Sequence, residues 1–161
     1  VVGKTKTKPV FKVTIDYGKS LFQMLKESKM EKWELLGKIT KEKFPVKGAG
    51  KHKVSIVLFR CNLEPYEFGQ ARDRISKRGY RPAKIEEIIA LVKTHSAKKL
   101  FKTNDVIVAL GSIWHDGGPE QSRGYVPCVC DDLEKTRIGI TPESETYQCL
   151  FAAVRKISKK H

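Results

Sequence analysis

The chain has 161 residues, of which 40% are hydrophobic and 31% are charged, and its formal net charge at pH 7 is +14. A chain of this length can bury about 70% of its unfolded surface, so one compact domain needs neither disulfides nor a structural metal. The abundance of Val, Ile, Leu and Phe excludes wholesale disorder. No apolar run reaches the roughly 18 residues that span a bilayer, so no membrane partner is expected.

The positive charge is concentrated in the first two thirds of the chain. Residues 1–104 carry 25 Lys and Arg against 10 Asp and Glu, whereas residues 105–161 carry 7 against 8. Such an asymmetric field attracts polyanions to one part of a molecule. The charge pattern therefore indicates a partner such as nucleic acid or a nucleoprotein assembly, and it says nothing about a reaction.

Hydrophobic periodicity divides the first 95 residues into elements. Alternation with a period of two indicates half-buried strands, and apolar residues three and four apart indicate helices. A strand that is apolar on both faces is expected to be central in its sheet. In chain order the patterns predict a flexible basic arm over 1–8, a strand over 10–17, helices over 20–29 and 31–39, a loop over 44–50, a central strand over 53–61, and helices over 66–78 and 82–95.

Local signals support several of these boundaries. Ser20 and Gln23 have the spacing of a capping box at the start of a helix. Gly79 suits the left-handed position after a helix, and Pro82 suits the first position of the next one. Trp33 lies on the apolar side of the second predicted helix. The clearest helical pattern has apolar residues at i, i+3, i+4 and i+7, namely Ile85, Ile88, Ile89 and Val92.

The hydrophobic period changes from 3.6 to two at Val106. The segments between the later patterns are short and rich in turn residues, which favours antiparallel neighbours. Helices grouped early and strands grouped late indicate an α+β fold. We expect a single domain over 9–161, with helices packed on a mainly antiparallel sheet that ends in a four-strand C-terminal meander. The four strands are expected over 106–114, 125–130, 136–141 and 147–156.

Three basic clusters are candidates for nucleic-acid binding: the arm, the loop over 41–53 and the segment over 72–84. Arginine presents a planar donor fork that matches phosphate oxygens, and a helix start at Pro82 adds a positive dipole end nearby. A solvated helix face is the alternative for any single cluster. If the clusters form one stripe, they predict a non-enzymatic module that contacts backbone phosphates of DNA or RNA with low sequence specificity. The candidate residues are Arg72, Arg74, Lys77, Arg78, Arg81, Lys84, Lys47 and Lys51, with Lys4, Lys6 and Lys8 in the arm.

Motifs for catalysis and metal binding are incomplete. Cys128 and Cys130 have C-x-C spacing rather than the paired spacing of zinc sites, so two strand cysteines are expected instead. His115 precedes an Asp in a Gly- and Pro-rich loop with no nucleophile spaced to match. The segment over 47–51 lacks the spacing of a phosphate loop and precedes a strand. We therefore expect no catalytic residue, no metal and no cofactor, and an enzyme is the third alternative.

The cysteines indicate the compartment. Cys61, Cys128, Cys130 and Cys149 are scattered along a chain that can build its own core. Such cysteines are usually small buried hydrophobes of a reducing environment. A cytoplasmic protein with four reduced, metal-free thiols is expected.

Three segments resemble a pattern in small uncharacterised bacterial proteins. They are 79–91, 106–114 and 151–156, and the resemblance implies no activity and no functional residue. The order of two helices and a strand meander is also similar in outline to C-type-lectin-like domains, although the chain has neither their paired disulfides nor their calcium-binding motifs. This outline implies an alternative function, in which the loop over 115–124 is displayed to a protein or a small ligand.

Overall fold

The computed structural model describes residues 8–102, 105–117, 123–132 and 135–156. Within these ranges the chain forms a nine-stranded, mostly antiparallel sheet and four α-helices. The predicted α+β class is therefore confirmed.

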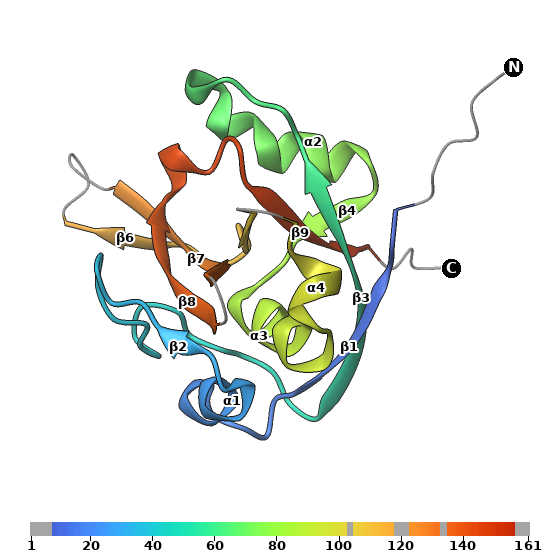
Figure 1. The fold of residues 1–161 in the computed structure, drawn as a ribbon, viewed down its shortest axis with the longest axis vertical. Helices are drawn as coiled ribbons and strands as arrows, with labels where there is room; N and C mark the ends of the chain where they lie inside the picture. The colour runs from blue at the N-terminus through green and yellow to red at the C-terminus, as the bar shows by residue number, and fades with distance from the viewer. Residues whose placement is uncertain (1–7, 103–104, 118–122, 133–134, 157–161) are drawn as a thin grey trace, which may run out of the picture.

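The elements follow one another in the order of Figure 1. Two short 3-10 helices, η1 and η2, lie among the regular elements. The bounds are β1 (Phe11–Asp16), α1 (Leu21–Ser28), β2 (Glu31–Lys32), β3 (Lys51–Arg60), η1 (Pro65–Gln70), α2 (Ala71–Lys77), β4 (Tyr80–Pro82), α3 (Ile85–Thr94), α4 (Ala97–Leu100), β5 (Val106–Val108), β6 (Trp114–Asp116), β7 (Arg123–Asp132), β8 (Lys135–Pro142), η2 (Glu143–Glu145) and β9 (Leu150–Arg155).

The sheet is strongly curved, and its two end strands are neighbours in the chain. The strand order is β1-β3-β9-β5-β7-β8-β2, with β4 beside β9 and β6 beside β7. Since β1 and β2 are joined through α1, that helix spans the opening between the two sheet ends. Figure 1 shows α3 inside the curve, between β1 and β3 on one side and β8 and β2 on the other.

Each face of the sheet carries its own hydrophobic cluster. Inside the curve, α3 is buried over its whole first two turns (85–91), and Leu21 and Met24 of α1 pack in the same cluster. On the outer face, Ala71 and Ile75 of α2 cover a second cluster that contains Phe151 of β9. The inner cluster fixes the curve of the sheet, and the outer cluster holds α2 on its back.

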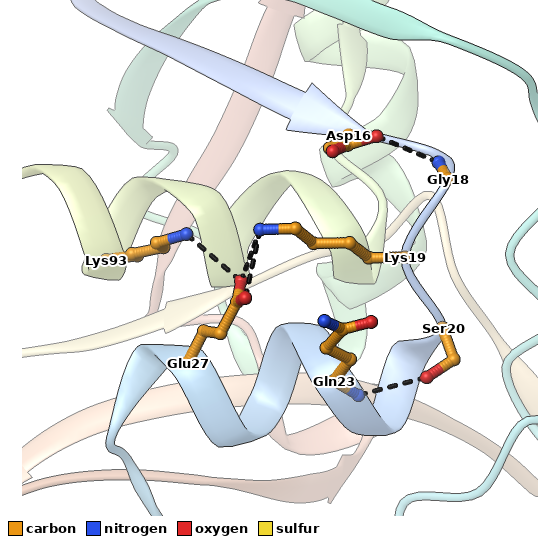
Figure 2. A network of polar contacts seen from close by, with 7 residues as sticks. All are labelled: Asp16, Gly18, Lys19, Ser20, Gln23, Glu27 and Lys93. Atoms are coloured by element: carbon orange, nitrogen blue, oxygen red, sulfur yellow. Dashed lines mark hydrogen bonds and ion pairs between the residues drawn. The ribbon is translucent and has the colours of Figure 1, made fainter.

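A polar network attaches α1 to the rest of the molecule, as Figure 2 shows. The Ser20 hydroxyl accepts the Gln23 N–H over 3.1 Å and caps the helix, as the sequence predicts. The Glu27 carboxylate accepts hydrogen bonds from Lys19 at 2.7 Å and from Lys93 of α3 at 3.2 Å. These contacts hold α1 against α3, where it closes the curved sheet.

Most predicted elements of the first 95 residues are present. The strand over 10–17 is β1, the helix over 20–29 is α1, and the helix over 66–78 begins as η1 and continues as α2. β3 lies between β1 and β9, which confirms the expected central position of the strand over 53–61. Gly79 has the predicted left-handed backbone, with φ of 84°.

The predicted helix over 31–39 is wrong. Its first residues form β2, which pairs with β8, and the Trp33 N–H donates to the Ile138 carbonyl over 2.8 Å. Trp33, Leu35 and Leu36 are 45%, 74% and 47% exposed. The apolar pattern therefore does not mark a buried helical face, because the backbone extends the sheet and the side chains point to solvent.

Pro82 does not begin a helix, contrary to the prediction. It is the last residue of β4, and α3 begins at Ile85 after Lys84. Backbone hydrogen bonding to neighbouring segments continues past the proline. The Ala83 N–H donates to the Ala152 carbonyl, and the Ala83 carbonyl accepts the Gly111 N–H. The positive end of the helix dipole thus lies at Lys84 rather than at Pro82.

The C-terminal strands follow the predicted meander only in part. The pattern over 106–114 is split into β5 and β6, and the expected connection after α3 contains α4. β5, β7 and β8 are antiparallel neighbours, but β9 leaves β8 and lies between β3 and β5, parallel to β5. The buried side chains over 151–154 explain this placement, because a strand that is apolar on both faces is most stable inside a sheet.

Candidate nucleic-acid interface

The arginines of the segment over 72–84 are largely engaged inside the molecule. Arg72 donates to the Glu143 carboxylate over 2.6 Å and to the Leu110 carbonyl over 2.7 Å. Arg74 donates to the Cys61 carbonyl over 2.7 Å. These donors tie α2 to distant parts of the chain.

The strongest of these internal contacts joins Arg81 to Glu87. Both guanidinium nitrogens donate to the two carboxylate oxygens over 2.8 Å, and the Glu87 side chain is only 1% exposed. Hydrogen bonds to Glu87 hold the pKa of Arg81 above its ordinary value. Lys77 pairs with Asp73 on the exposed face of α2 over 3.0 Å.

A phosphate-binding face over 72–84 stays a prediction. The guanidinium groups of Arg72, Arg74 and Arg81 bind carboxylates and carbonyl oxygens of the same chain, so a phosphate would compete with these contacts. Arg78 is exposed and has no described carboxylate partner, and it belongs to a different surface.

This surface, which we call the basic strip, lies on the outer face of β1, β3 and β9. In the sheet register Lys12 is opposite Ser55, and Thr14 is opposite Lys53. Side chains two apart on a strand, and side chains directly opposite, share a face. The strip therefore continues the outer face beyond the edge of α2. Its members are Lys8, Lys12, Lys51, Lys53, Arg78, Arg155 and Lys156.

Two cations of the basic strip meet over one aromatic ring. The Lys8 ammonium lies 4.1 Å from the centroid of the Phe59 ring, and the Arg78 guanidinium lies 5.2 Å from it. Burial and then the neighbouring positive charge of Arg78 lower the pKa of Lys8. The ring thus holds together two like charges that repel each other.

The basic strip is short of acidic partners. Within the described ranges, none of its seven cations forms an ion pair with a carboxylate. Asp16 lies opposite Lys51 in the register, and its carboxylate accepts the Gly18 N–H. Between the ends of β3 and β9 the surface is hollowed by a cleft of about 750 Å³, lined by residues that include Lys53, Arg155 and Lys156.

The eight predicted residues thus separate into three groups. Lys51 and Arg78 lie in the basic strip, and Arg81 touches its cleft while bound to Glu87. Lys47 and Lys84 line a different cleft, beside the start of α3. The third group already has protein partners: Arg72 and Arg74 bond to distant segments, and Lys77 pairs with Asp73 on the exposed face of α2.

Other predictions fall partly on residues that the structure leaves undescribed. Lys4 and Lys6 of the arm lie outside the described residues. The loop over 115–124 begins in β6 and ends in β7, which are antiparallel neighbours. Its central residues, 118–122, lie outside the described residues. The display function proposed for this loop stays a prediction.

Sequence reasoning missed Lys12, Arg155 and Lys156 of the strip, and it included Lys53 only as part of the basic loop over 41–53. Lys12 and Lys53 occupy the outward positions of β1 and β3, and Arg155 follows the buried run of β9. The alternation that predicted these strands also placed the lysines on their exposed face. What it did not reveal is the pairing of β3 with β1 and β9, which brings these positions together.

The described cysteines are unpaired thiols, and burial makes them poor nucleophiles. Burial raises the pKa of Cys128 to about 12 and that of Cys149 to about 11. No group of three or more His, Cys, Asp or Glu side chains suited to a metal is present in the described part of the chain.

No protein-family model matches this chain, and no curated protein or solved structure is significantly similar to it. None of the helices that the structure describes combines the length and apolar character required to cross a bilayer.

Proposed function

We propose that the protein is a non-enzymatic module that binds nucleic acid, alone or in a nucleoprotein assembly, through the basic strip. The observation that carries the proposal is the gathering of seven cations, from five segments of the chain, on one face with no described carboxylate paired to them. Solvated charges that serve solubility alone are normally interspersed with the opposite sign. A predominantly positive surface beside a cleft favours a polyanionic ligand.

The chemistry of the strip favours contact with phosphates rather than with bases. Its cations are mostly lysines, which bind phosphate as point charges. Base stacking requires an exposed aromatic ring, and the ring at the centre of the strip, Phe59, is 5% exposed and covered by Lys8 and Arg78. Binding is therefore expected to be similar for different base sequences.

A pair of matched variants tests the proposal. Lys53→Ala/Arg155→Ala removes two charges from the strip, and Lys26→Ala/Lys98→Ala removes two exposed charges from α1 and α4. The strip variant should bind a fluorescently labelled duplex on the order of tenfold to a hundredfold more weakly at low salt, by about the same factor for two unrelated base sequences. The measurement is fluorescence anisotropy.

The control variant should bind within about twofold of the unchanged protein, since it alters the net charge equally but not the strip. Equal losses in both variants would show that only net charge matters. No detectable binding of any nucleic acid by the unchanged protein would remove the proposal altogether.

A cytoplasmic location is part of the same proposal. It is supported by the unpaired thiols of a chain that builds two hydrophobic clusters without cross-links.

A further inference from the structure

A second cleft lies at one end of the curved sheet, beside the start of α3. It measures about 290 Å³, close to the lower bound for sites that bind small molecules. The open ends of curved and closed sheets are frequent positions for such sites. Its polar lining consists of Lys43, Lys47, Lys84, Glu86 and Ser112.

Close backbone contacts shape the wall of this cleft. A Cβ atom at Gly111 would lie 2.7 Å from the carbonyl oxygens of both Pro82 and Ala83, so only glycine fits where these two segments meet. The Ser112 hydroxyl accepts the N–H of Ile85 over 2.8 Å and fixes this wall to the start of α3. The cleft is therefore built by the fold itself rather than by surface side chains alone.

The N–H groups at the start of α3 are already used by the protein. The Ser112 hydroxyl accepts the Ile85 N–H, and the Glu87 carboxylate accepts the Lys84 N–H, each over 2.8 Å. A ligand in the cleft would therefore meet the lysine ammoniums rather than the helix N-terminus. Neither Lys47 nor Lys84 forms an ion pair with a carboxylate among the described residues, and Lys43 lies 4.4 Å above the Trp114 ring.

The acidic member of the lining is a buried carboxyl group. The Glu86 side chain is only 2% exposed, and burial, followed by the nearby charge of Glu87, raises its pKa. Burial, followed by the charge of Glu86, raises the pKa of Tyr17 to about 12, which places the Tyr17 side chain close to this carboxyl group. A raised pKa favours the protonated form of this carboxyl group, and in that form it carries no charge against an anion and donates a hydrogen bond.

We propose that this cleft binds a phosphate monoester, with Lys47 and Lys84 as the charge partners and Glu86 as a hydrogen-bonding group in its lining. Two ammoniums that line one cleft complement the dianionic charge of a monoester better than the single charge of an internal phosphodiester. The monoester is either a free small molecule or the terminal phosphate of a nucleic-acid strand. The cleft is distinct from the basic strip, so this inference does not depend on the proposed function.

Calorimetry with two pairs of probes tests the inference and separates these sources. One pair is adenosine 5′-monophosphate and adenosine, and the other is a short oligonucleotide with and without a 5′-phosphate. If the ligand is a free small-molecule monoester, adenosine 5′-monophosphate should bind at least about tenfold more tightly than adenosine. If the ligand is the terminal phosphate of a nucleic-acid strand, only the oligonucleotide pair should show this difference: the 5′-phosphorylated strand should bind at least about tenfold more tightly than the unphosphorylated one.

Variants assign the binding to the cleft. Lys47→Ala/Lys84→Ala should abolish the preference for the phosphorylated probe, whereas Lys53→Ala/Arg155→Ala in the strip should keep it. Glu86→Gln retains a hydrogen-bond donor and should bind within about threefold of the unchanged protein. Because Glu86 is buried, thermal unfolding of each variant checks that the protein still folds. The inference is overturned if neither phosphorylated probe is preferred, or if the preference survives in the Lys47 and Lys84 double variant.

Discussion

At the scale of single residues, the proposed binding depends on whether a cation already has a partner in the protein. Arg81 and Lys53 both adjoin the same cleft, but Arg81 binds Glu87 through two hydrogen bonds and Lys53 has no described carboxylate partner. The first therefore contributes to the fold, and the second is free to contact a ligand. Sequence spacing alone does not distinguish these two roles.

Replacing Arg81 by Ala should destabilise the protein strongly. The change leaves the Glu87 carboxylate buried without its charged partner, and such losses cost about 3–5 kcal/mol. We expect about 3 kcal/mol, at the lower end, because the Arg81 side chain is 36% exposed. Urea unfolding measures the difference. Lys77→Ala is the control and should cost less than about 0.5 kcal/mol, since its pair with Asp73 is exposed. A loss below about 1 kcal/mol for Arg81→Ala contradicts this role.

The buried thiols should react slowly in the folded protein. Burial raises the pKa of Cys128 to about 12, so very little thiolate is present at pH 8. Alkylation of Cys128 by iodoacetamide, followed by mass spectrometry, should be about a hundredfold slower in buffer than in concentrated urea. All four cysteines should be alkylated in urea without a reductant. Equal rates in the two conditions would argue against a buried Cys128, and fewer than four modified thiols in urea would argue against four reduced cysteines.

At the scale of elements, α1 closes the gap between the two ends of the sheet, and its attachment depends on ionised Glu27. Hydrogen bonds from Lys19 and then from Lys93 lower the pKa of Glu27 in the folded protein. A carboxylate whose pKa is lower in the folded than in the unfolded state stabilises the fold above its unfolded pKa. That contribution is lost as the pH falls through the lowered folded pKa.

Glu27→Gln should therefore lower the melting temperature at pH 7, and the difference from the unchanged protein should shrink as the pH falls from about 5 to about 3. The effect should also weaken at high salt, because both ion pairs are near the surface. Thermal unfolding followed by circular dichroism at several pH values measures it. A difference that persists unchanged at pH 3 would assign the effect to packing rather than to charge.

The accuracy of the sequence predictions depended on how local each signal was. α3 was predicted from its own apolar spacing, and α1 from its cap and spacing, because these patterns directly reflect burial and helix ends. The helix over 31–39 failed because Trp33 and Leu35 are apolar but exposed. β9 was recognised as a strand, but its place between β3 and β5 depends on pairings between distant segments.

The candidate site was predictable only in its chemistry. The excess of basic residues drew attention to the first two thirds of the chain, where five of the seven strip cations lie, among them Lys51 and Arg78. Spacing did not reveal that Arg72 already binds a carboxylate, because its partner, Glu143, is 71 residues away in the sequence. Burial and ion pairing are properties of the folded molecule, so a cluster in the sequence does not establish a free charged face.

At the scale of the whole molecule, the net charge of +14 is divided between structural and unpaired cations. Arg72 and Arg74 hold α2 on the back of the sheet, and Arg81 joins β4 to α3 inside the curve. Lysines dominate the basic strip on the outer face of β1, β3 and β9. If the strip binds nucleic acid, each neutralised phosphate releases counterions, and affinity must fall steeply with salt. The salt dependence therefore reports how many of these cations contact phosphate.

The most direct measurement is the affinity for a DNA duplex as a function of salt concentration, for the unchanged protein and for Lys53→Ala/Arg155→Ala. About five phosphate contacts should give a log–log slope of roughly −4.5, a loss of several hundredfold between about 50 and 200 mM salt. The double variant should reduce the magnitude of this slope by about two. A slope near zero, or an equally steep slope in the double variant, would contradict the claim that the basic strip binds nucleic acid.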